Sequence, residues 1–144
     1  GVPDVTGVWC HPAGGSRMII VLSIKQRFAG HARQAATIAS QCRAGAYLCR
    51  FVIVVDDDID PSDTYNVLWA MASRTDPQQD IDIMRKCWSS KTDPLIRKES
   101  TSYFNSRAII DACRPFDWID EFPPVSESSP ELCKRITEKF GKYL

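Results

Sequence analysis

The sequence lacks the features that define several classes of protein. Its longest apolar runs, residues 18–22 and 51–55, have the length of a strand and fall far short of a membrane-spanning helix. Charge of neither sign predominates, because 18 basic side chains balance 18 acidic ones. Nothing in the net charge therefore favours nucleic acid or an anionic membrane as a partner. What remains is a chain of 144 residues, 44% hydrophobic and 25% charged, which is typical of one globular domain.

Zinc-type cysteine spacing is also absent. The six cysteines are Cys10, Cys42, Cys49, Cys87, Cys113 and Cys133, and no two of them form a CxxC pair. A domain of this size does not depend on disulfides, so we expect reduced thiols and a cytoplasmic protein, with a disulfide framework as the alternative. His11 and His31 have no partner at ligand spacing, and we expect no metal site from them.

The apolar pattern of the first half predicts alternating strands and helices. Two β-rich runs, residues 5–11 and 18–25, are joined by a Pro- and Gly-containing segment and predict a hairpin. Small apolar residues at helical spacing predict a helix over residues 27–42, with Gly45 as its C-terminal cap. The β-branched run 51–55 then predicts the clearest strand of the chain.

The second half is less regular. Asp60 followed by Pro61 predicts the start of a helix that continues to Arg74. Residues 75–114 predict mainly ordered loop with short strands or turns. A last helix is predicted to open at Ser129, with three apolar residues on one stripe. Those residues are Leu132, Ile136 and Phe140.

Together these elements predict an α/β fold. We expect a mixed sheet with a β-hairpin followed by a right-handed βαβ crossover, helices packed on the sheet, and a C-terminal helix. Residues 1–125 would form the α/β domain. Residues 126–144 would form the helix, which could dock on a neighbouring subunit or pack on its own domain, since an apolar stripe serves either purpose.

Two sets of charged residues could carry chemistry. Asp56, Asp58 and Asp60 alternate as in a calcium loop, but Pro61 stands where that loop needs glycine, which excludes an EF-hand. The aspartates could form a solvated loop before a capped helix, or could bind a cation or act as a base. The second set is basic and lies near the predicted strand and helix ends. It consists of Arg43, Arg50 and Arg74, which could hold a phosphate or carboxylate or could pair with carboxylates of the chain itself.

Several ordered motifs resemble those of one enzyme family. They are Arg43-Ala44-Gly45, RFVIVVDDDIDP at 50–61, VLWA at 67–70, Arg74, DIDI at 80–83, Asp93-Pro94-Leu95, NSRAIIDA at 105–112 and the prolines at 123–124. In this order they resemble the C-terminal domain of the UbiD decarboxylases, and the likeness extends from residue 7 to residue 124. Within the family, the chain is similar to enzymes that act on hydroxybenzoates such as protocatechuate.

The resemblance implies a non-oxidative decarboxylase of aromatic or α,β-unsaturated carboxylic acids that uses prenylated FMN with Mn²⁺ and K⁺. It also implies that a preceding N-terminal domain binds the flavin and the metal and supplies the Glu–Arg–Glu catalytic set. We therefore expect no catalytic residue and no metal ligand in this chain, inactivity of the chain alone, and a dimer or hexamer of the full-length protein. The alternative is a stand-alone assembly or regulatory module that has no chemistry of its own.

The resemblance further implies roles for individual residues. Arg43 matches a family lysine that reaches the flavin phosphate, and the change to arginine keeps the charge but alters the geometry. Arg74 matches a residue near the cation and phosphate region. Asp93, Pro94 and Leu95 match a loop that edges the substrate pocket, where Leu95 would be an apolar wall. Ala46 stands where ferulic acid decarboxylases have a tyrosine, so that role is not carried over to Tyr47.

Overall fold

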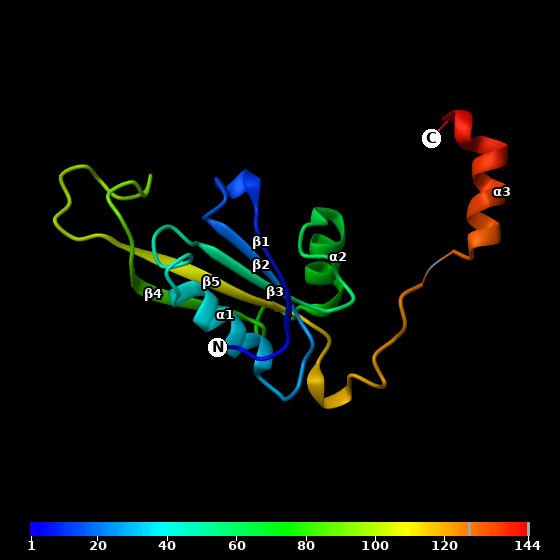
Figure 1. Cartoon of the computed structure of the whole chain (residues 1–144), viewed down its shortest axis with the longest axis horizontal. Coiled ribbons are helices and arrows are strands. Elements are labelled where there is room, and N and C mark those ends of the chain that lie inside the picture. The colour runs from blue at the N-terminus through cyan, green and yellow to red at the C-terminus, as the bar shows by residue number, and fades with distance from the viewer. Residues whose placement is uncertain (127, 144) are drawn as a thin grey trace.

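The computed structural model of the chain describes residues 1–126 and 128–143. It shows a five-stranded sheet with helices on both faces (Figure 1). The strands are β1 (Val5–Cys10), β2 (Ile19–Ile24), β3 (Phe51–Asp56), β4 (Ile81–Trp88) and β5 (Phe104–Ala112). The helices are α1 (His31–Gln41), α2 (Thr64–Arg74) and α3 (Pro130–Phe140), with single 3₁₀ turns at Pro12–Gly14, Phe116–Trp118 and Gly141–Tyr143.

The strand order β1-β2-β3-β5-β4 confirms the expected mixed sheet. Strands β2, β3 and β5 run parallel at its centre, and the edge strands β1 and β4 are antiparallel to their neighbours. The hairpin β1–β2 and the crossover from β2 through α1 to β3 are both present. The parallel strands therefore begin at one end of the sheet and finish at the other.

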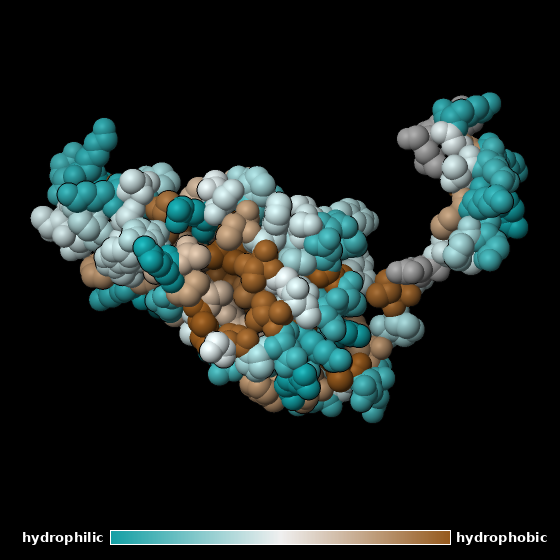
Figure 2. Space-filling model, viewed as in Figure 1, coloured by the Kyte–Doolittle hydropathy of each residue, from teal (hydrophilic) through white to brown (hydrophobic). Residues whose placement is uncertain are grey.

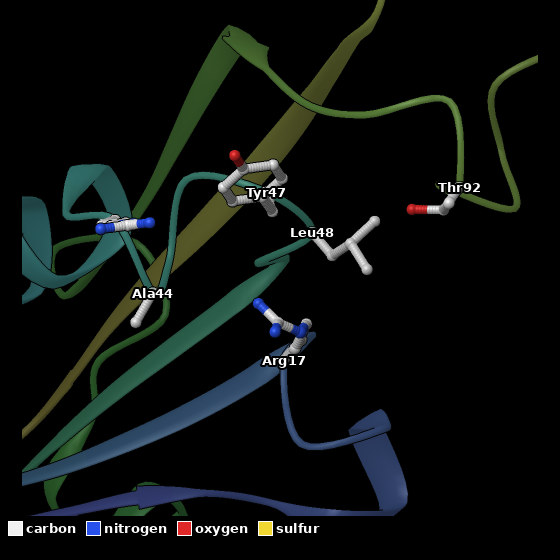
Figure 3. A pocket seen from close by; sticks show the side chains of 6 residues that line it. Arg17, Ala44, Tyr47, Leu48 and Thr92 are labelled. Atoms are coloured by element: carbon white, nitrogen blue, oxygen red, sulfur yellow. The ribbon is translucent and has the colours of Figure 1, made fainter.

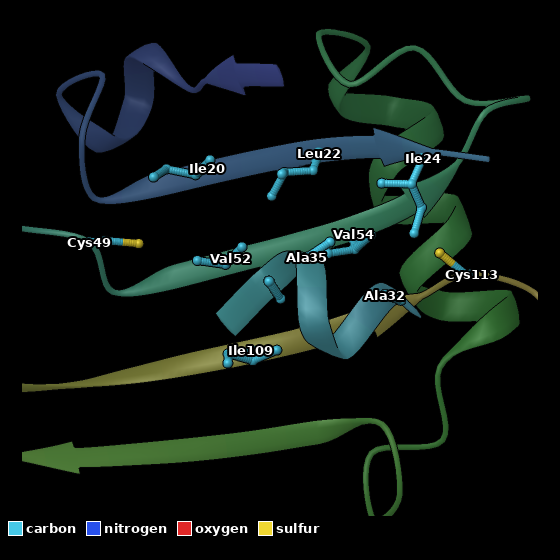
Figure 4. Packing of buried hydrophobic residues seen from close by; sticks show 11 residues of the cluster. Ile20, Leu22, Ile24, Ala32, Ala35, Cys49, Val52, Val54, Ile109 and Cys113 are labelled. Atoms are coloured by element: carbon cyan, nitrogen blue, oxygen red, sulfur yellow. The ribbon is translucent and has the colours of Figure 1, made fainter. Parts of the chain in front are cut away.

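Two apolar clusters explain why the central strands are so uniformly hydrophobic. Each central strand presents alternate side chains to the two faces of the sheet, and one apolar cluster covers each face. Helix α1 lies on one face, where Figure 4 shows its Ala35 in front of Val52 and Val54 of β3. Helix α2 packs on the other face through Val67 and Ala70. Ala32, Ala35 and Ala36 of α1 are almost fully buried, so small side chains let this helix approach the sheet closely.

The prediction that residues 75–114 are mainly loop is wrong, because this segment contains β4 and the central strand β5. Strand β5 was hard to recognise because Asn105 and Arg107 interrupt its apolar pattern, although both side chains are buried and hydrogen-bonded. Strand β4 carries exposed charges such as Arg85 and Lys86 because it is an edge strand. Its register also shifts between Met84 and Cys87.

Two predicted helix boundaries also need correction. Helix α2 begins at Thr64, and its N-cap is Asp63, whose carboxylate accepts the Asn66 N–H at 3.1 Å. Asp60 instead accepts the Ser62 N–H in the preceding turn. Helix α1 is capped by Cys42 in an extended conformation, so Gly45 is not its cap. Gly45 lies in the following turn, where a Cβ atom would overlap the Ala39 carbonyl oxygen.

The last helix forms where the sequence predicts it, capped by Ser129. Figure 1 shows α3 standing away from the sheet, and Ile136 and Phe140 on its stripe are exposed. A second apolar surface lies between the β1–β2 hairpin and α1, where Figure 2 shows hydrophobic side chains in the middle of the face. An apolar groove of about 220 Å³ runs there, and its wall includes Val8 and Ile38. No helix in the described ranges is long and apolar enough to cross a membrane.

Candidate functional site

A cavity of about 660 Å³ opens where the parallel strands begin. Three segments that are distant in sequence form it: the turn before β2, the turn before β3, and the loop after β4. Its wall is made of Arg17, Arg43, Ala44, Tyr47, Leu48 and Thr92. Figure 3 shows the Thr92 hydroxyl directed towards Leu48.

The cavity is positively charged. Arg17 and Arg43 both line it, and none of the other described residues of its wall is acidic. Among the described residues, neither guanidinium has a hydrogen-bond or ion-pair partner. Two unpaired cations beside the apolar surface of Leu48 and Tyr47 suit an anion that carries an apolar or aromatic group.

The turn that carries Arg43 is held by a buried arginine from β5. Arg107 is 1% exposed and donates to the carbonyl oxygens of Ala46, at 2.8 Å, and of Ser40 at the end of α1. It also donates to the Trp88 carbonyl oxygen at the end of β4. Gly45 permits the close approach of this turn to α1. The position of Arg43 is therefore fixed by the sheet and by α1 together.

The loop that carries Thr92 is anchored by Asp93. This carboxylate is 2% exposed and pairs with Arg50, which leads into β3. It also accepts hydrogen bonds from Ser89 at 2.9 Å and Asn105 at 3.2 Å. Burial by itself would raise the pKa of Asp93, but the Leu95 N–H, the Ser89 hydroxyl and the Arg50 charge together lower this pKa below its usual value.

The structure thus divides the predicted pocket loop into an anchor and an exposed part. Asp93 points into the protein, whereas Pro94 is exposed and Leu95 is 77% exposed. Leu95 lines a separate cavity of about 460 Å³ together with Phe104. It is Thr92, the residue before Asp93, that shares the cavity with Arg43.

Arg74 lies at the opposite end of β3 and is not brought together with Arg43. A six-residue strand separates the two ends by roughly 20 Å. Arg74 is 5% exposed and donates to Asp56 at 3.1 Å and to Asp58 at 2.7 Å. The hydrogen bond from Arg74 lowers the pKa of Asp58, while the Arg74 Nε is buried without a partner in the described structure.

The aspartate run is consequently part of an internal ionic network. Asp56 is 1% exposed and also accepts from Gln26 at 2.8 Å and from Arg114. Of the three predicted anion-binding arginines, Arg50 and Arg74 bind carboxylates of the chain itself. Only Arg43 keeps a free guanidinium within the described residues.

A second large cavity, of about 520 Å³, lies beyond the carboxyl ends of the parallel strands. Asp76, Asp80, Asp111 and Asp117 line it, together with Arg114. Burial, with a smaller contribution from the charge of the nearby Asp80, raises the pKa of Asp111 to about 6. In the described part of the chain, no three His, Cys, Asp or Glu side chains are grouped as a metal site.

The geometry defines an α/β domain with an arginine-lined, partly apolar cavity at one end of its sheet. The family model for the 3-octaprenyl-4-hydroxybenzoate carboxy-lyase C-terminal domain matches residues 1–112. The chain therefore belongs to the UbiD family and is its C-terminal domain, as the sequence motifs predicted. Enzymes of this family are decarboxylases.

Solved structures of UbiD-class enzymes share the fold. HmfF from Pelotomaculum thermopropionicum in complex with FMN is 30% identical over 99% of this chain, with a TM-score of 0.76. The 3,4-dihydroxybenzoic acid decarboxylase from Enterobacter cloacae is 25% identical over 99%, with a TM-score of 0.72. An evolved dimeric HmfF in complex with prFMN is 28% identical over 99%, with a TM-score of 0.66. The chain spans only 30%, 29% and 27% of these three proteins, respectively.

Sequence reasoning missed two kinds of residue at this site. Arg17 follows a glycine-rich turn, and no motif marks it as part of a cavity. Asn105 and Arg107 were noticed only as part of a family motif, and nothing in their spacing indicated that they are buried. Polar side chains at alternate positions of a strand are the signal that could have identified them as an internal hydrogen-bonding pair.

Proposed function

We propose that this domain supplies one wall of the cofactor and substrate site of a non-oxidative decarboxylase. The substrates would be aromatic or α,β-unsaturated carboxylic acids, among them hydroxybenzoates. A preceding domain would bind most of the prenylated FMN, together with Mn²⁺ and K⁺, and would provide the acid–base residues. The observation that carries this proposal is the Arg43 guanidinium, which has no partner among the described residues and lines a partly apolar cavity.

The residues present fit the phosphate end of a flavin. Arg43 is exposed and has no partner among the described residues, so it can donate two hydrogen bonds to a phosphate without breaking a contact of the fold. Tyr47 and Leu48 add apolar surface beside it. When bound, prenylated flavin supplies the covalent chemistry of decarboxylation, whereas this chain binds its phosphate and limits the entry of water.

The other predicted contacts remain part of the proposal. Leu95 presents most of its side chain outward and would meet the substrate side of the site in the complete enzyme. Pro94 would stiffen that loop, and Asp93 would position it through Arg50. A cofactor contact by Arg74 would have to use its Nε–H or the second hydrogen of its Nη2, because its other three donors already bind Asp56 and Asp58.

Flavin retention in the full-length enzyme tests the proposal. Replacing Arg43 with alanine (Arg43→Ala) removes a charge-assisted hydrogen bond worth about 1.5–3 kcal/mol. We expect purified Arg43→Ala enzyme to lose flavin on dilution, as measured by absorbance. The control is Arg85→Ala, which alters an exposed arginine on the edge strand β4. Equal flavin occupancy in Arg43→Ala, Arg85→Ala and wild type would refute the contact.

Two measurements separate a catalytic domain from a stand-alone module. The 144-residue chain with added prenylated flavin should release no carbon dioxide from protocatechuate, and turnover would overturn the proposal. The intact mass of the native gene product should exceed the mass of this chain. A native product of 144 residues would favour the alternative, an assembly or regulatory module. We also propose a cytoplasmic location, which agrees with six free thiols.

We propose in addition that α3 docks on a second copy of the protein. Ile136 and Phe140 of its apolar stripe are exposed, and the helix lies away from its own sheet (Figure 1). The groove between β1 and α1 offers an apolar surface that this stripe could cover. In the full-length protein, the docking of α3 from one copy into this groove of another would contribute to a dimer or hexamer.

Sedimentation velocity tests the docking of α3. A lysine in the stripe (Ile136→Lys) places a charge in the proposed contact, and we expect it to shift the protein towards smaller species. Thr137→Lys adds the same charge at the next position, outside the stripe of Leu132, Ile136 and Phe140, and should leave the assembly unchanged. The proposal fails if both variants sediment as the wild type does.

A further inference from the structure

We propose that Arg17 is a second cationic ligand of the anion bound by Arg43. The inference rests on the proposed function, since it assigns another residue to the same phosphate site. No sequence motif points to Arg17. The assignment comes from the cavity, which brings Arg17 and Arg43 together from turns that precede two neighbouring strands.

The backbone around Arg17 is held in place by the hairpin turn. Gly15 has a φ of 61°, a conformation that favours glycine, and it closes the 3₁₀ turn before β2. The N–H groups of Arg17 and Met18 both donate to the Gly14 carbonyl oxygen, at 3.2 and 2.8 Å. The Met18 carbonyl oxygen then accepts the N–H groups of Arg50 and of the following residue, both at 3.0 Å. Arg17 is thereby tied to the start of β3, which follows the turn that carries Arg43.

The charges of the cavity determine the class of ligand. Arg17 and Arg43 both line it, and none of its described lining residues is acidic, so an anion bound there is attracted by both cations. Two planar guanidinium groups offer enough donors for a phosphate with two negative charges. Tyr47 and Leu48 form the rest of the wall, and Thr92 adds a hydroxyl. The ligand is therefore a phosphate monoester attached to an apolar or aromatic group.

FMN and riboflavin are matched probes, because riboflavin lacks only the phosphate. We expect the 144-residue chain to bind FMN about tenfold or more tightly than riboflavin, as measured by flavin fluorescence. Arg17→Gln should weaken FMN binding about tenfold and leave riboflavin binding unchanged. Arg43→Gln should act in the same way. Arg85→Gln, on the edge strand β4, is the control for loss of a positive charge, and circular dichroism confirms that each variant is folded.

The possible outcomes separate this inference from the proposed function. If Arg43→Gln weakens FMN binding and Arg17→Gln does not, the assignment of Arg17 is wrong and the proposed function stands. If the wild-type chain shows no preference for FMN, or if neither variant weakens it, both the phosphate site and the assignment of Arg17 are overturned. If Arg85→Gln weakens FMN binding as much as Arg17→Gln does, the loss reflects only the net charge of the chain, and the assignment of Arg17 is overturned.

Discussion

Replacing Asp93 with asparagine (Asp93→Asn) tests how the site is held together. The wild-type carboxylate accepts from the Leu95 N–H at 3.1 Å, from Ser89 at 2.9 Å and from Asn105 at 3.2 Å, and it pairs with Arg50. Asparagine removes the charge and turns an NH₂ group towards two donors. Breaking one side of a buried ion pair costs about 3 kcal/mol, and Tm should fall by roughly 10 °C for a domain of this size.

The assay is thermal and urea unfolding followed by circular dichroism. Asp57→Asn is the matched control, because Asp57 is an exposed aspartate on the loop that follows β3. Since the pKa of Asp93 is lowered in the folded state, its stabilisation is present above about pH 4 and is lost as the pH falls through the folded pKa. The difference between Asp93→Asn and wild type should therefore shrink in acid. If Asp93→Asn unfolds like Asp57→Asn at neutral pH, the anchoring role is refuted.

Two further perturbations test the other end of the sheet and the Arg43 turn. Because burial raises the pKa of Asp111 to about 6, wild-type stability should fall by up to about 3 kcal/mol between pH 4 and pH 7, and Asp111→Asn should abolish that fall in urea titrations. A decline that Asp111→Asn leaves intact would mean that another group causes it. Gly45→Ala forces a Cβ against the Ala39 carbonyl oxygen and should destabilise the domain by about 1–3 kcal/mol, whereas Gly1→Ala, which meets no atom within 4 Å, should be neutral. Equal urea midpoints for these two variants would contradict the close approach.

Much of the fold could be predicted because the apolar residues of β3 and α1 follow a clear pattern along the chain. The central strand β3 is apolar throughout since both of its faces are covered, and α1 shows a clear stripe of alanines. Family motifs between residues 7 and 124 then indicated the correct domain, whose family model matches residues 1–112. These elements depend on local composition, which a single sequence displays directly.

The missed elements depend on tertiary contacts. Strand β5 contains a buried arginine whose donors are satisfied by the Ser40, Ala46 and Trp88 carbonyl groups, and no local pattern indicates those partners. In the same way, Asp60–Pro61 has the composition of a helix start, but Asp60 caps a turn and Asp63 caps the helix. Local propensity does not decide between two aspartates three residues apart.

The candidate site was predictable only in part. Arg43 was identified through its motif, and the structure places it in a cavity. Arg74 was expected in the same region, but it lies at the other end of β3 in an ionic network with Asp56 and Asp58. Spacing along the chain does not reveal at which end of a strand a side chain finds its partner. Arg17 was not predicted because no sequence motif marks it.

The central claim is tested most directly by mapping where FMN binds on this chain. The map comes from changes in backbone amide chemical shifts, with riboflavin as the reference. We predict that the phosphate-dependent changes are concentrated at the amino ends of the parallel strands, around Arg17, Arg43 to Leu48 and Thr92. Changes concentrated instead around Asp76, Asp80 and Arg114, in the cavity at the opposite end of the sheet, would contradict the central claim.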